Sequence, residues 1–511
     1  MKAVESSRAA RIDRLAQECF HIPPLVLMED AGLAAWRLAC DRLWEGRLPR
    51  EPIVFLAGRG NNGGDALVMA RQCRLEGHCQ AAVVLAGEPA PESLAGHHLA
   101  ICEALGLEVL RFPEDAHRVG QRLAHAGWVV DGLAGTGLAG AARPPLDSLI
   151  GLVNAAPGRT LAVDIPSGVG DAFREGFPAV EAELTLTIGI PKLCLYLPLA
   201  RRLCGEILVV PGVFPRELTE AEDIPGEMLD DGAWQALRPL PRDAHKGKRG
   251  HLAVFAGSEG TTGAAWLAAT AAARSRVGLT TLFLDRALYS TAVRRFQSVM
   301  VRPWDALPAS MPGFARGSAR PGFDARRFTA LLVGPGWGLA RERAVWLARL
   351  LELGLPGVLD ADGITLLAGQ PGVRLGGRWV LTPHPGEFAR LAGVEVAAVL
   401  ADPLPQLLAM SAKLEAVIVL KGHCSFVASP EGRYWILDGC NPALATGGSG
   451  DVLAGIIGGL AAGGLAPLAA ARLGVLLHAR AGEQAYRERG YFLAEDLLPY
   501  LSLLVKDRRD A

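Results

Sequence analysis

The chain has 511 residues, of which 50% are hydrophobic, and 61 glycines, so it has enough material for two or three packed domains. Its net charge is -1 and neither sign forms a long block, which excludes the basic surface typical of proteins that bind nucleic acids or acidic membranes. Nine scattered cysteines lack paired or zinc-ligand spacing, as in a reducing compartment. We therefore expect a cytoplasmic protein with a small-molecule partner, and no nucleic-acid or membrane partner.

Two segments bear on targeting and membrane insertion. Residues 1–20 mix charges with apolar residues at helical spacing and lack the apolar core of a signal peptide. Residues 452–471 carry no charge and are long enough to raise the question of a membrane span. Their glycines and alanines around one proline instead predict a tightly packed pair of core helices.

Short apolar runs alternate with helix-like stretches along most of the chain, which is the pattern of parallel sheets covered by helices. The predicted strands of the first half are residues 52–57, 80–85, 128–130, 160–163, 184–188 and 206–210. Those of the second half are residues 251–255, 279–284, 330–333, 357–359, 416–420 and 434–437. Residues 214–250 are rich in charge and proline and predict a linker. We therefore predict two α/β domains, residues 1–225 and 226–511.

The first predicted strand runs into GRGNNGGD, which has the spacing GxGxxG at Gly58, Gly60 and Gly63. This spacing is typical of the strand-to-helix turn that holds dinucleotide phosphates. A dehydrogenase also needs an acid at the end of its second strand to hold a ribose hydroxyl. Here the second strand ends in Ala86 and Gly87, so the glycine loop alone leaves the kind of site open.

Three loops with polar or acidic residues follow predicted strands: NNGGD at residues 61–65, DGLAGTGLAGA at 131–141 and DIPSG at 164–168. Ligands bind at the carboxyl ends of strands in open parallel sheets. Each aspartate by itself is more simply explained as a helix cap or a turn residue. Together, the loops favour a site that surrounds a pyrophosphate without a dedicated ribose acid.

These loops, with PKLCL at residues 191–195, closely resemble the NAD(P)H-hydrate epimerase domain, which has a Rossmann-like fold. In that family the dinucleotide is the substrate, damaged by addition of water across a nicotinamide double bond, so the missing ribose acid is explained. The resemblance implies a catalytic Asp164 beside the hydrated ring. It implies a potassium ion on Asn62, Asp131 and Ser167, which offer hard oxygen ligands. The implied substrate-binding residues are Asn61, Asn62, Gly63, Gly64, Asp65, Gly135, Thr136, Gly137, Leu138, Ala139, Gly140, Ala141 and Asp164.

The most informative stretch of the second half is NPALATGGSGDVLAGIIGG at residues 441–459. Its glycine loop enters a small-residue helix, so backbone amides and a positive helix end converge beside Asp451. Such an assembly stabilises phosphate charge while the acid takes a hydroxyl proton. It resembles the anion hole and catalytic aspartate of the ribokinase-like fold.

Further motifs occur in the order of the ADP/ATP-dependent NAD(P)H-hydrate dehydratase family: VGPGWG at residues 333–338, LDADG at 359–363, LTPHPGEF at 381–388 and LKGHCSF at 420–426. The resemblance implies that the hydrated dinucleotide contacts Ala264, Gly336, His384 and the catalytic Asp451. It implies that ADP or ATP, with magnesium, contacts Lys421, Gly422, His423, Cys424, Ser425, Gly447, Gly448, Ser449 and Gly450.

The two resemblances imply a bifunctional repair enzyme for hydrated NADH and NADPH, which we expect to be a homo-oligomer. The first domain would interconvert the R and S hydrates, and the second would dehydrate the S hydrate, with AMP and phosphate as products if ADP is the donor. Phosphorylating the hydroxyl explains the need for a nucleotide, because phosphate leaves more readily than hydroxide. The alternative is a ribokinase-like vitamin or sugar kinase fused to a non-catalytic Rossmann-like binding domain.

Overall fold

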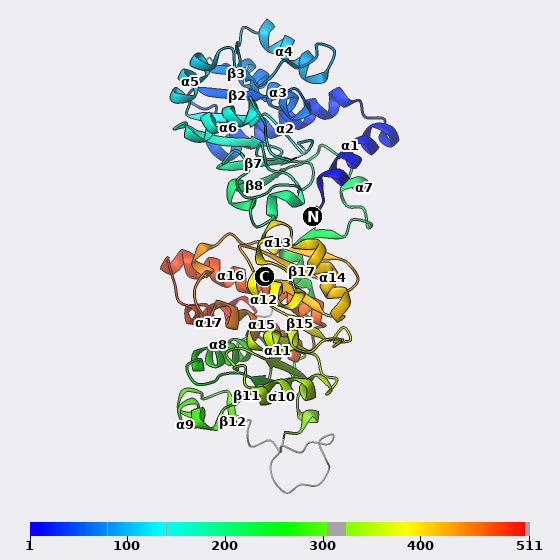
Figure 1. Ribbon diagram of the computed structural model, residues 1–511, viewed down its shortest axis with the longest axis vertical. Helices are drawn as coiled ribbons and strands as arrows, with labels where there is room; N and C mark the ends of the chain where they lie inside the picture. Colours follow the sequence, from blue (N-terminus) through cyan, green and yellow to red (C-terminus); the bar gives the residue numbers. More distant parts are fainter. Residues whose placement is uncertain (79, 139, 304–322, 506–511) are drawn as a thin grey trace. The chain divides into compact units, whose positions relative to one another are not determined.

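The computed structural model describes residues 1–78, 80–138, 140–303 and 323–505 (Figure 1). The chain divides into two compact units, Met1–Glu227 and Met228–Ala511. Each unit is built on a largely parallel sheet with helices packed on it, so the expected fold class is confirmed. Within the described ranges, no helix is long and apolar enough to cross a membrane.

The sheet of unit 1 has seven strands in the order β4-β3-β2-β5-β6-β7-β8, and all neighbouring strands are parallel. The strands are β2 (Ile53–Ala57), β3 (Ala81–Leu85), β4 (Glu108–Arg111), β5 (Trp128–Gly132), β6 (Arg159–Val163), β7 (Leu184–Ile188) and β8 (Glu206–Val210). After β2 the chain forms β3 and β4 on one side of β2, and it then returns to form β5 on the other side. The loops after β2 and β5 therefore flank the point where the strand order reverses, which is where such sheets bind ligands.

Helices cover both faces of this sheet, which explains why its strands are continuous apolar runs. Along β2, Phe55 packs in one hydrophobic cluster, whereas Val54 and Leu56 pack in another. The helices of unit 1 are α1 (Ser6–Phe20), α2 (Pro24–Trp44), α3 (Asn61–Leu75), α4 (Leu94–Ala104), α5 (Ala116–His125), α6 (Leu146–Ala155) and α7 (Arg216–Thr219).

The main sheet of unit 2 runs in the order β18-β17-β16-β15-β14-β13-β10-β11-β12. Strand β17 is antiparallel to both of its neighbours, and the other pairs are parallel. The strands are β10 (His251–Phe255), β11 (Leu279–Leu284), β12 (Met300–Pro303), β13 (Ala330–Val333), β14 (Gly357–Leu359), β15 (Trp379–Leu381), β16 (Val417–Leu420), β17 (Cys424–Ala428) and β18 (Tyr434–Asp438). The carboxyl ends of β13 to β16 consequently lie along one edge.

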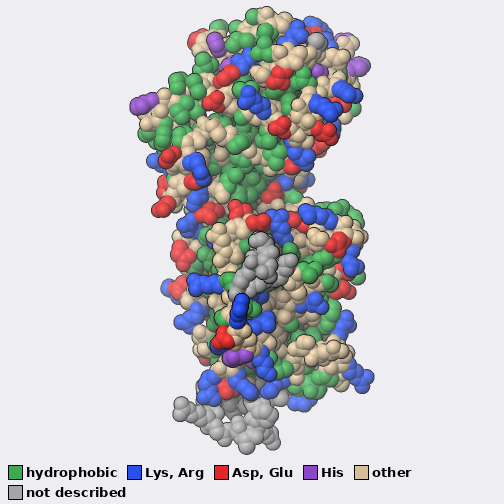
Figure 2. All heavy atoms as spheres, turned by 180° about the vertical axis from the view of Figure 1, so that it is seen from behind, with side chains coloured by type: hydrophobic (Ala, Val, Ile, Leu, Met, Phe, Trp, Pro, Cys, Tyr) green, Lys and Arg blue, Asp and Glu red, His purple; other side chains and the backbone are tan. Residues whose placement is uncertain are grey.

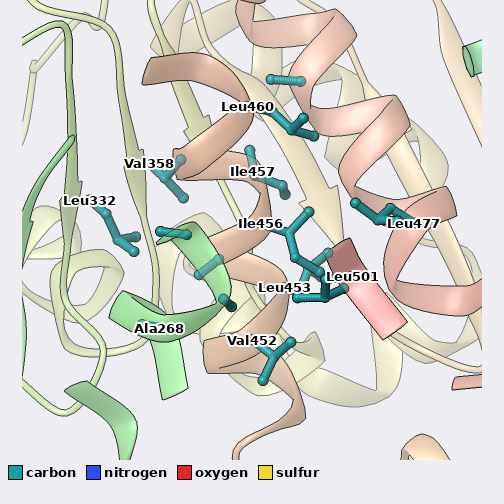
Figure 3. Close-up of a cluster of buried hydrophobic side chains, with 14 of the residues drawn as sticks. Ala268, Leu332, Val358, Val452, Leu453, Ile456, Ile457, Leu460, Leu477 and Leu501 are labelled. Carbon is teal, nitrogen blue, oxygen red and sulfur yellow. The ribbon is translucent and has the colours of Figure 1, made fainter. Parts of the chain in front are cut away.

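Two helices, α15 (Ser449–Ala462) and α16 (Pro467–Arg489), form the predicted pair of core helices. Their apolar side chains belong to the same hydrophobic cluster as those of the sheet, and Figure 3 shows α15, with Ile456, between Leu332 of the sheet and Leu477 of α16. A Cβ atom on Gly455 would lie 2.3 Å from the carbonyl oxygen of Ala268, so glycine lets α15 approach the helix α8 (Thr262–Ala273) closely. The other helices of unit 2 are α8 (Thr262–Ala273), α9 (Arg286–Arg295), α10 (Arg341–Leu351), α11 (Asp362–Ala368), α12 (Pro385–Ala392), α13 (Val396–Ala401), α14 (Leu404–Leu414) and α17 (Leu498–Leu504).

Two predictions about the elements are wrong. Residues 214–250 are not a plain linker, because they contain α7 and β9 (Gly226–Met228), and β9 pairs with β1 (Lys2–Ala3) near the N-terminus. A salt bridge of 2.9 Å between Lys2 and Glu227 supports this pairing. Four strands were also missed, each of five residues or fewer and without a strong apolar pattern of its own. They are β4, β12, β15 and β17.

Charged side chains of both signs are interspersed over the face shown in Figure 2. This distribution agrees with the near-neutral net charge of -1. The described cysteines form no disulfide.

Candidate functional site

A cavity of about 280 Å³ lies at the carboxyl ends of β6 and β7 in unit 1, bordered by α1, α2 and α3. Four of the predicted substrate residues line it: Asn61, Asp65, Thr136 and Asp164. Helix α1 adds three polar residues that no sequence motif indicated: Asp13, Arg14 and Gln17. The cavity thus joins residues from both ends of the unit-1 sequence.

The glycines of GxGxxG make the turn between β2 and α3 tight. A Cβ atom on Gly63 would lie 2.0 Å from the carbonyl oxygen of Gly58, and one on Gly58 would lie 1.9 Å from that of Leu133. Only glycine fits at these two positions, because real Cβ atoms do not approach a carbonyl so closely. Helix α3 begins at Asn61 directly after this turn, so its amino end lies at the rim of the cavity.

Asp164 follows β6 and is paired with a lysine that sequence reasoning missed. Its Oδ1 atom accepts hydrogen bonds from Lys192 Nζ at 2.5 Å and from the backbone amide of Ile188 at 3.0 Å. Lys192 Nζ also donates to the carbonyl of Ile188 at 2.6 Å, and the residue is 4% exposed. The motif PKLCL contained this lysine, but nothing local indicated its partner.

Asp65 lies in the first turns of α3 and is also buried at the cavity. Burial raises the pKa of its carboxyl well above the usual value, and the nearby Asp164 carboxylate raises it further, whereas Lys192 opposes the rise. The cavity therefore combines an ammonium–carboxylate pair with a second, buried carboxyl group.

The predicted potassium ligands come from the first turn of α3 (Asn62), the end of β5 (Asp131) and the loop after β6 (Ser167). Asp131, at the end of β5, accepts hydrogen bonds from the backbone amide and hydroxyl of Ser167 at 2.8 and 2.6 Å. Burial raises the pKa of Asp131 to about 6, against the effect of these hydrogen bonds. Both polar side-chain atoms of Asn62 are buried without a hydrogen-bond partner among the described residues. A buried carboxylate and an unpartnered amide oxygen fit a monovalent cation.

Among the described residues, the other predicted substrate residues of the two loops do not line the cavity. Gly64 packs beneath it, because a Cβ atom there would lie 2.4 Å from the sulfur of Met28. Ala139 lies outside the described residues. The other described substrate residues that do not line the cavity are Asn62, Gly63, Gly135, Gly137, Leu138, Gly140 and Ala141.

In unit 2, Lys421 lies where several strand ends meet. Its backbone amide donates to the carbonyl of Pro383 at 2.9 Å, which ties the loop after β15 to that after β16. Its Nζ atom donates to Asp360 Oδ1 at 2.9 Å and lies 3.9 Å from Glu387 Oε2. A Cβ atom on Gly450 would lie 3.2 Å from the same Nζ, so the first turn of α15 is adjacent.

Asp451 lies in that first turn, after Gly448, whose φ of +91° requires the left-handed conformation that glycine favours. Burial raises the pKa of Asp451 to about 7, and Asp360 adds to the rise, whereas Lys421 lowers it. Burial lowers the pKa of the Lys421 ammonium. The negative charges of Asp360, Glu387 and Asp451 outweigh this effect, so the pKa is raised overall. Asp451 is thus poised to exchange a proton near neutral pH.

The predicted dinucleotide residues of unit 2 lie on neighbouring loops. Gly336 has a φ of +53°, and its carbonyl accepts a hydrogen bond from the hydroxyl of Thr261 at 2.7 Å, three residues before Ala264 in α8. His384 caps α12, because its Nδ1 accepts from the amide of Gly386 at 3.0 Å. The capping role fixes the exposed ring of His384 beside the site.

The predicted nucleotide residues fall in two groups. Gly422 and His423 form the exposed turn after Lys421, and Cys424 and Ser425 begin β17. The second group is the loop that enters α15: Gly447, Gly448, Ser449 and Gly450. The hydroxyl of Ser449 lies 3.0 Å from Nε2 of His478, a partly buried histidine whose pKa is lowered to about 4 by desolvation.

Sequence reasoning missed Asp360 and Glu387, although the motifs LDADG and TPHPGE contain them. Their carboxylates are near Lys421 only in three dimensions. Within the described ranges, no group of three or more histidine, cysteine, aspartate or glutamate side chains could hold a metal.

Models of two protein families match this chain. One, described as NAD(P)H-hydrate dehydratase, matches residues 252–502. The other, described as YjeF-related protein N-terminus, matches residues 24–194. The two matches fall in different structural units.

Curated relatives are similar over almost their whole length. The bifunctional NAD(P)H-hydrate repair enzyme Nnr of Moorella thermoacetica is 36% identical, over 99% of this chain and 97% of its own. That of Coxiella burnetii is 36% identical, over 98% of this chain and 99% of its own. A solved structure of ADP/ATP-dependent NAD(P)H-hydrate dehydratase from Bacillus subtilis, co-crystallised with ATP and Mg²⁺, is 26% identical and covers 55% of this chain and 99% of its own, with a TM-score of 0.47.

The full-length similarity covers both units and both predicted sites. It supports the hypothesis of a bifunctional repair enzyme over the alternative of a vitamin or sugar kinase fused to a binding domain. The chain therefore belongs to the family of bifunctional NAD(P)H-hydrate repair enzymes.

Proposed function

We propose that the two units divide the repair of hydrated NADH and NADPH between them. Residues 1–225 interconvert the R and S hydrates, and residues 226–511 use ADP or ATP to dehydrate the S hydrate. Interconversion supplies the second unit with the only epimer that it consumes, which gives the fusion a chemical purpose. The observation that carries the proposal is the carboxyl group of Asp451, held at the amino end of α15 beside Lys421.

In the dehydration step, Asp451 accepts the proton of the substrate hydroxyl while the hydroxyl oxygen bonds to the terminal phosphorus of the nucleotide. The backbone amides at the start of α15 stabilise the negative charge of the transferring phosphoryl group, and Lys421 adds a positive charge nearby. Phosphate then leaves with the oxygen, and loss of a ring proton restores the nicotinamide double bond. The products are NADH or NADPH, phosphate, and AMP if ADP is the donor.

In the epimerisation step, the Asp164–Lys192 pair is placed to act on the hydrated ring. The amino end of α3 and the loop after β5 hold the pyrophosphate. The Asp164 carboxylate then faces the nicotinamide ring, whose nitrogen gains positive charge when the hydroxyl leaves. Lys192 fixes the position of that carboxylate through its short hydrogen bond.

We further propose a potassium ion on Asn62, Asp131 and Ser167, and magnesium that arrives with the nucleotide. When bound, the potassium ion supplies positive charge that balances the buried Asp131 carboxylate. We also place the enzyme in the cytoplasm as a homo-oligomer, and light scattering after size-exclusion chromatography measures the number of subunits.

The test uses the full chain with a mixture of R and S hydrates of NADH and either ADP or ATP. Recovery of dihydronicotinamide absorbance from both epimers, faster than their spontaneous interconversion, is the expected result. Chromatography of the nucleotide identifies AMP or ADP as the product. A stable phosphorylated compound without recovered absorbance would instead identify a kinase.

A further inference from the structure

Three carboxyl groups line the cavity of unit 1, those of Asp13, Asp65 and Asp164, and the surroundings of Asp65 and Asp164 differ. Asp164 accepts hydrogen bonds from Lys192 and from the backbone amide of Ile188. Asp65 is 8% exposed, and within the described ranges no donor forms a hydrogen bond with its carboxyl group. One group therefore has the environment of a carboxylate, and the other has that of a neutral acid.

The charged groups around Asp65 agree with this difference. Burial raises the pKa of Asp65, and the negative charges of Asp164 and Asp13 act in the same direction, whereas Lys192 opposes them. Arg14 also borders the cavity, but it lies on the exposed side of α1. A neutral carboxylic acid next to an ammonium–carboxylate pair is an arrangement that suits proton donation.

The chemistry of the hydrate calls for such a donor. The electron-rich double bond beside the ring nitrogen is the one that adds water, so the hydroxyl lies on C6, next to that nitrogen. Inversion at C6 can occur when the C6–O bond breaks and forms again on the opposite face of the ring. Because hydroxide is a poor leaving group, an acid that protonates it lowers the barrier.

We propose that Asp65 is the general acid of epimerisation, an inference that rests on the proposed epimerase function. Asp65 gives its proton to the C6 hydroxyl, the C6–O electron pair leaves with the water, and the lone pair of the ring nitrogen forms a C6–N double bond. Water then adds to the opposite face, the π electrons return to nitrogen, and the proton lost by the adding water returns to the Asp65 carboxylate. The Asp164 carboxylate stabilises the cationic ring between these two steps.

Asp65→Asn in the full chain tests the proposal, because asparagine keeps the size and neutrality of the acid but has no acidic proton. We expect kcat for epimerisation to fall by about 100-fold or more, and KM to stay within about threefold of the parent. The melting temperature should not fall. Dehydration of pure S hydrate by unit 2 of the same variant should keep its parental rate, and the exposed Asp41→Asn change in α2 is the matched control.

Epimerisation by Asp65→Asn within about threefold of the parental rate would overturn the proposal. So would a variant with raised KM and parental kcat, since Asp65 would then only bind substrate. A second measurement avoids any dependence on folding of the variant: the parent, acting in oxygen-18 water, should place the heavy isotope in the product hydroxyl at each inversion. Inversion without incorporation contradicts the proposed step, whereas a parent that does not epimerise at all contradicts the proposed function itself.

Discussion

The ammonium group of Lys421 donates a 2.9 Å hydrogen bond to Oδ1 of Asp360, a carboxylate that is only 1% exposed. The same oxygen accepts a hydrogen bond of 2.7 Å from the hydroxyl of Thr382. Because these residues follow β14, β15 and β16, one buried carboxylate ties three strand ends together. Lys421 is thereby held in a fixed position beside Gly450 and Asp451.

Asp360→Asn should shift the pH dependence of dehydration to lower pH. Asp360 is, after burial, the largest contributor to the raised pKa of Asp451, so its neutralisation makes Asp451 easier to ionise. We also expect kcat to fall by about tenfold, roughly 1.4 kcal/mol at the barrier, because Lys421 loses its anchor. A pH–rate profile of the variant measures both effects. The exposed Asp243→Asn change is the control, and an unshifted profile would contradict the assigned interaction.

Asp451→Asn should abolish nucleotide-dependent repair and leave epimer interconversion nearly intact. Removal of the proton acceptor typically costs a factor of about 100 to 10,000 in rate. The acids of unit 1 act at a separate site, so their reaction should be independent of this change. Absorbance recovery and epimer ratios, each measured on the folded variant, give the two rates. Repair at a near-parental rate would show that Asp451 is not the base.

The raised pKa of Asp451 also predicts a change in stability with pH. The folded state holds this proton up to about pH 7, whereas the unfolded chain releases it near the usual value of 3.8. Stability contributed by the protonated carboxyl is therefore present at low pH and is lost as pH rises through about 7. Asp451→Asn should raise the melting temperature of unit 2 above pH 7 and have little effect near pH 4. Calorimetry at both pH values checks the sign, and equal shifts would refute it.

Lys421→Ala should raise the apparent nucleotide requirement more than the requirement for hydrated NADH. The lysine extends from the end of β16 toward the first turn of α15, where the phosphate chain of the nucleotide is proposed to lie. Its removal also leaves Asp360 buried without its cation, so some loss of stability is expected. Steady-state kinetics with each ligand varied in turn separates the two requirements. If only the requirement for hydrated NADH rose, the nucleotide and the dinucleotide would bind in each other's proposed positions.

Asp131→Ala should weaken both cation binding and dinucleotide binding in unit 1. The change removes a buried carboxylate that accepts two hydrogen bonds from Ser167, so the loop after β6 loses its anchor. The parent should melt at a higher temperature in potassium chloride than in tetramethylammonium chloride of equal strength, and the variant should lose this difference. Unchanged affinity for both ligands in the variant would remove the cation from the proposed site.

Much of the fold was predictable because its signals are local. Most strands of the two sheets are rich in apolar residues, since both of their faces are buried, and β7, β8, β10, β11, β13 and β14 begin and end where the sequence predicts. The three-residue strand β15 was missed although the equally short β14 was predicted, so a run of three apolar residues is a weak signal. Strand β9 was missed because its pairing with β1 joins residues about 225 positions apart.

The sequence by itself determined the glycine loops, the acidic residues at strand ends and the order of the motifs, because these depend on residue type and short spacing. Only the tertiary structure decided which charges meet: Lys192 with Asp164, 28 positions apart, and Lys421 with Asp360, 61 positions apart. It also decided that Asp65 is buried without a hydrogen-bond donor among the described residues. Strand order brings such residues together, and burial then sets which of them carry charge, so neither property can be read from local sequence.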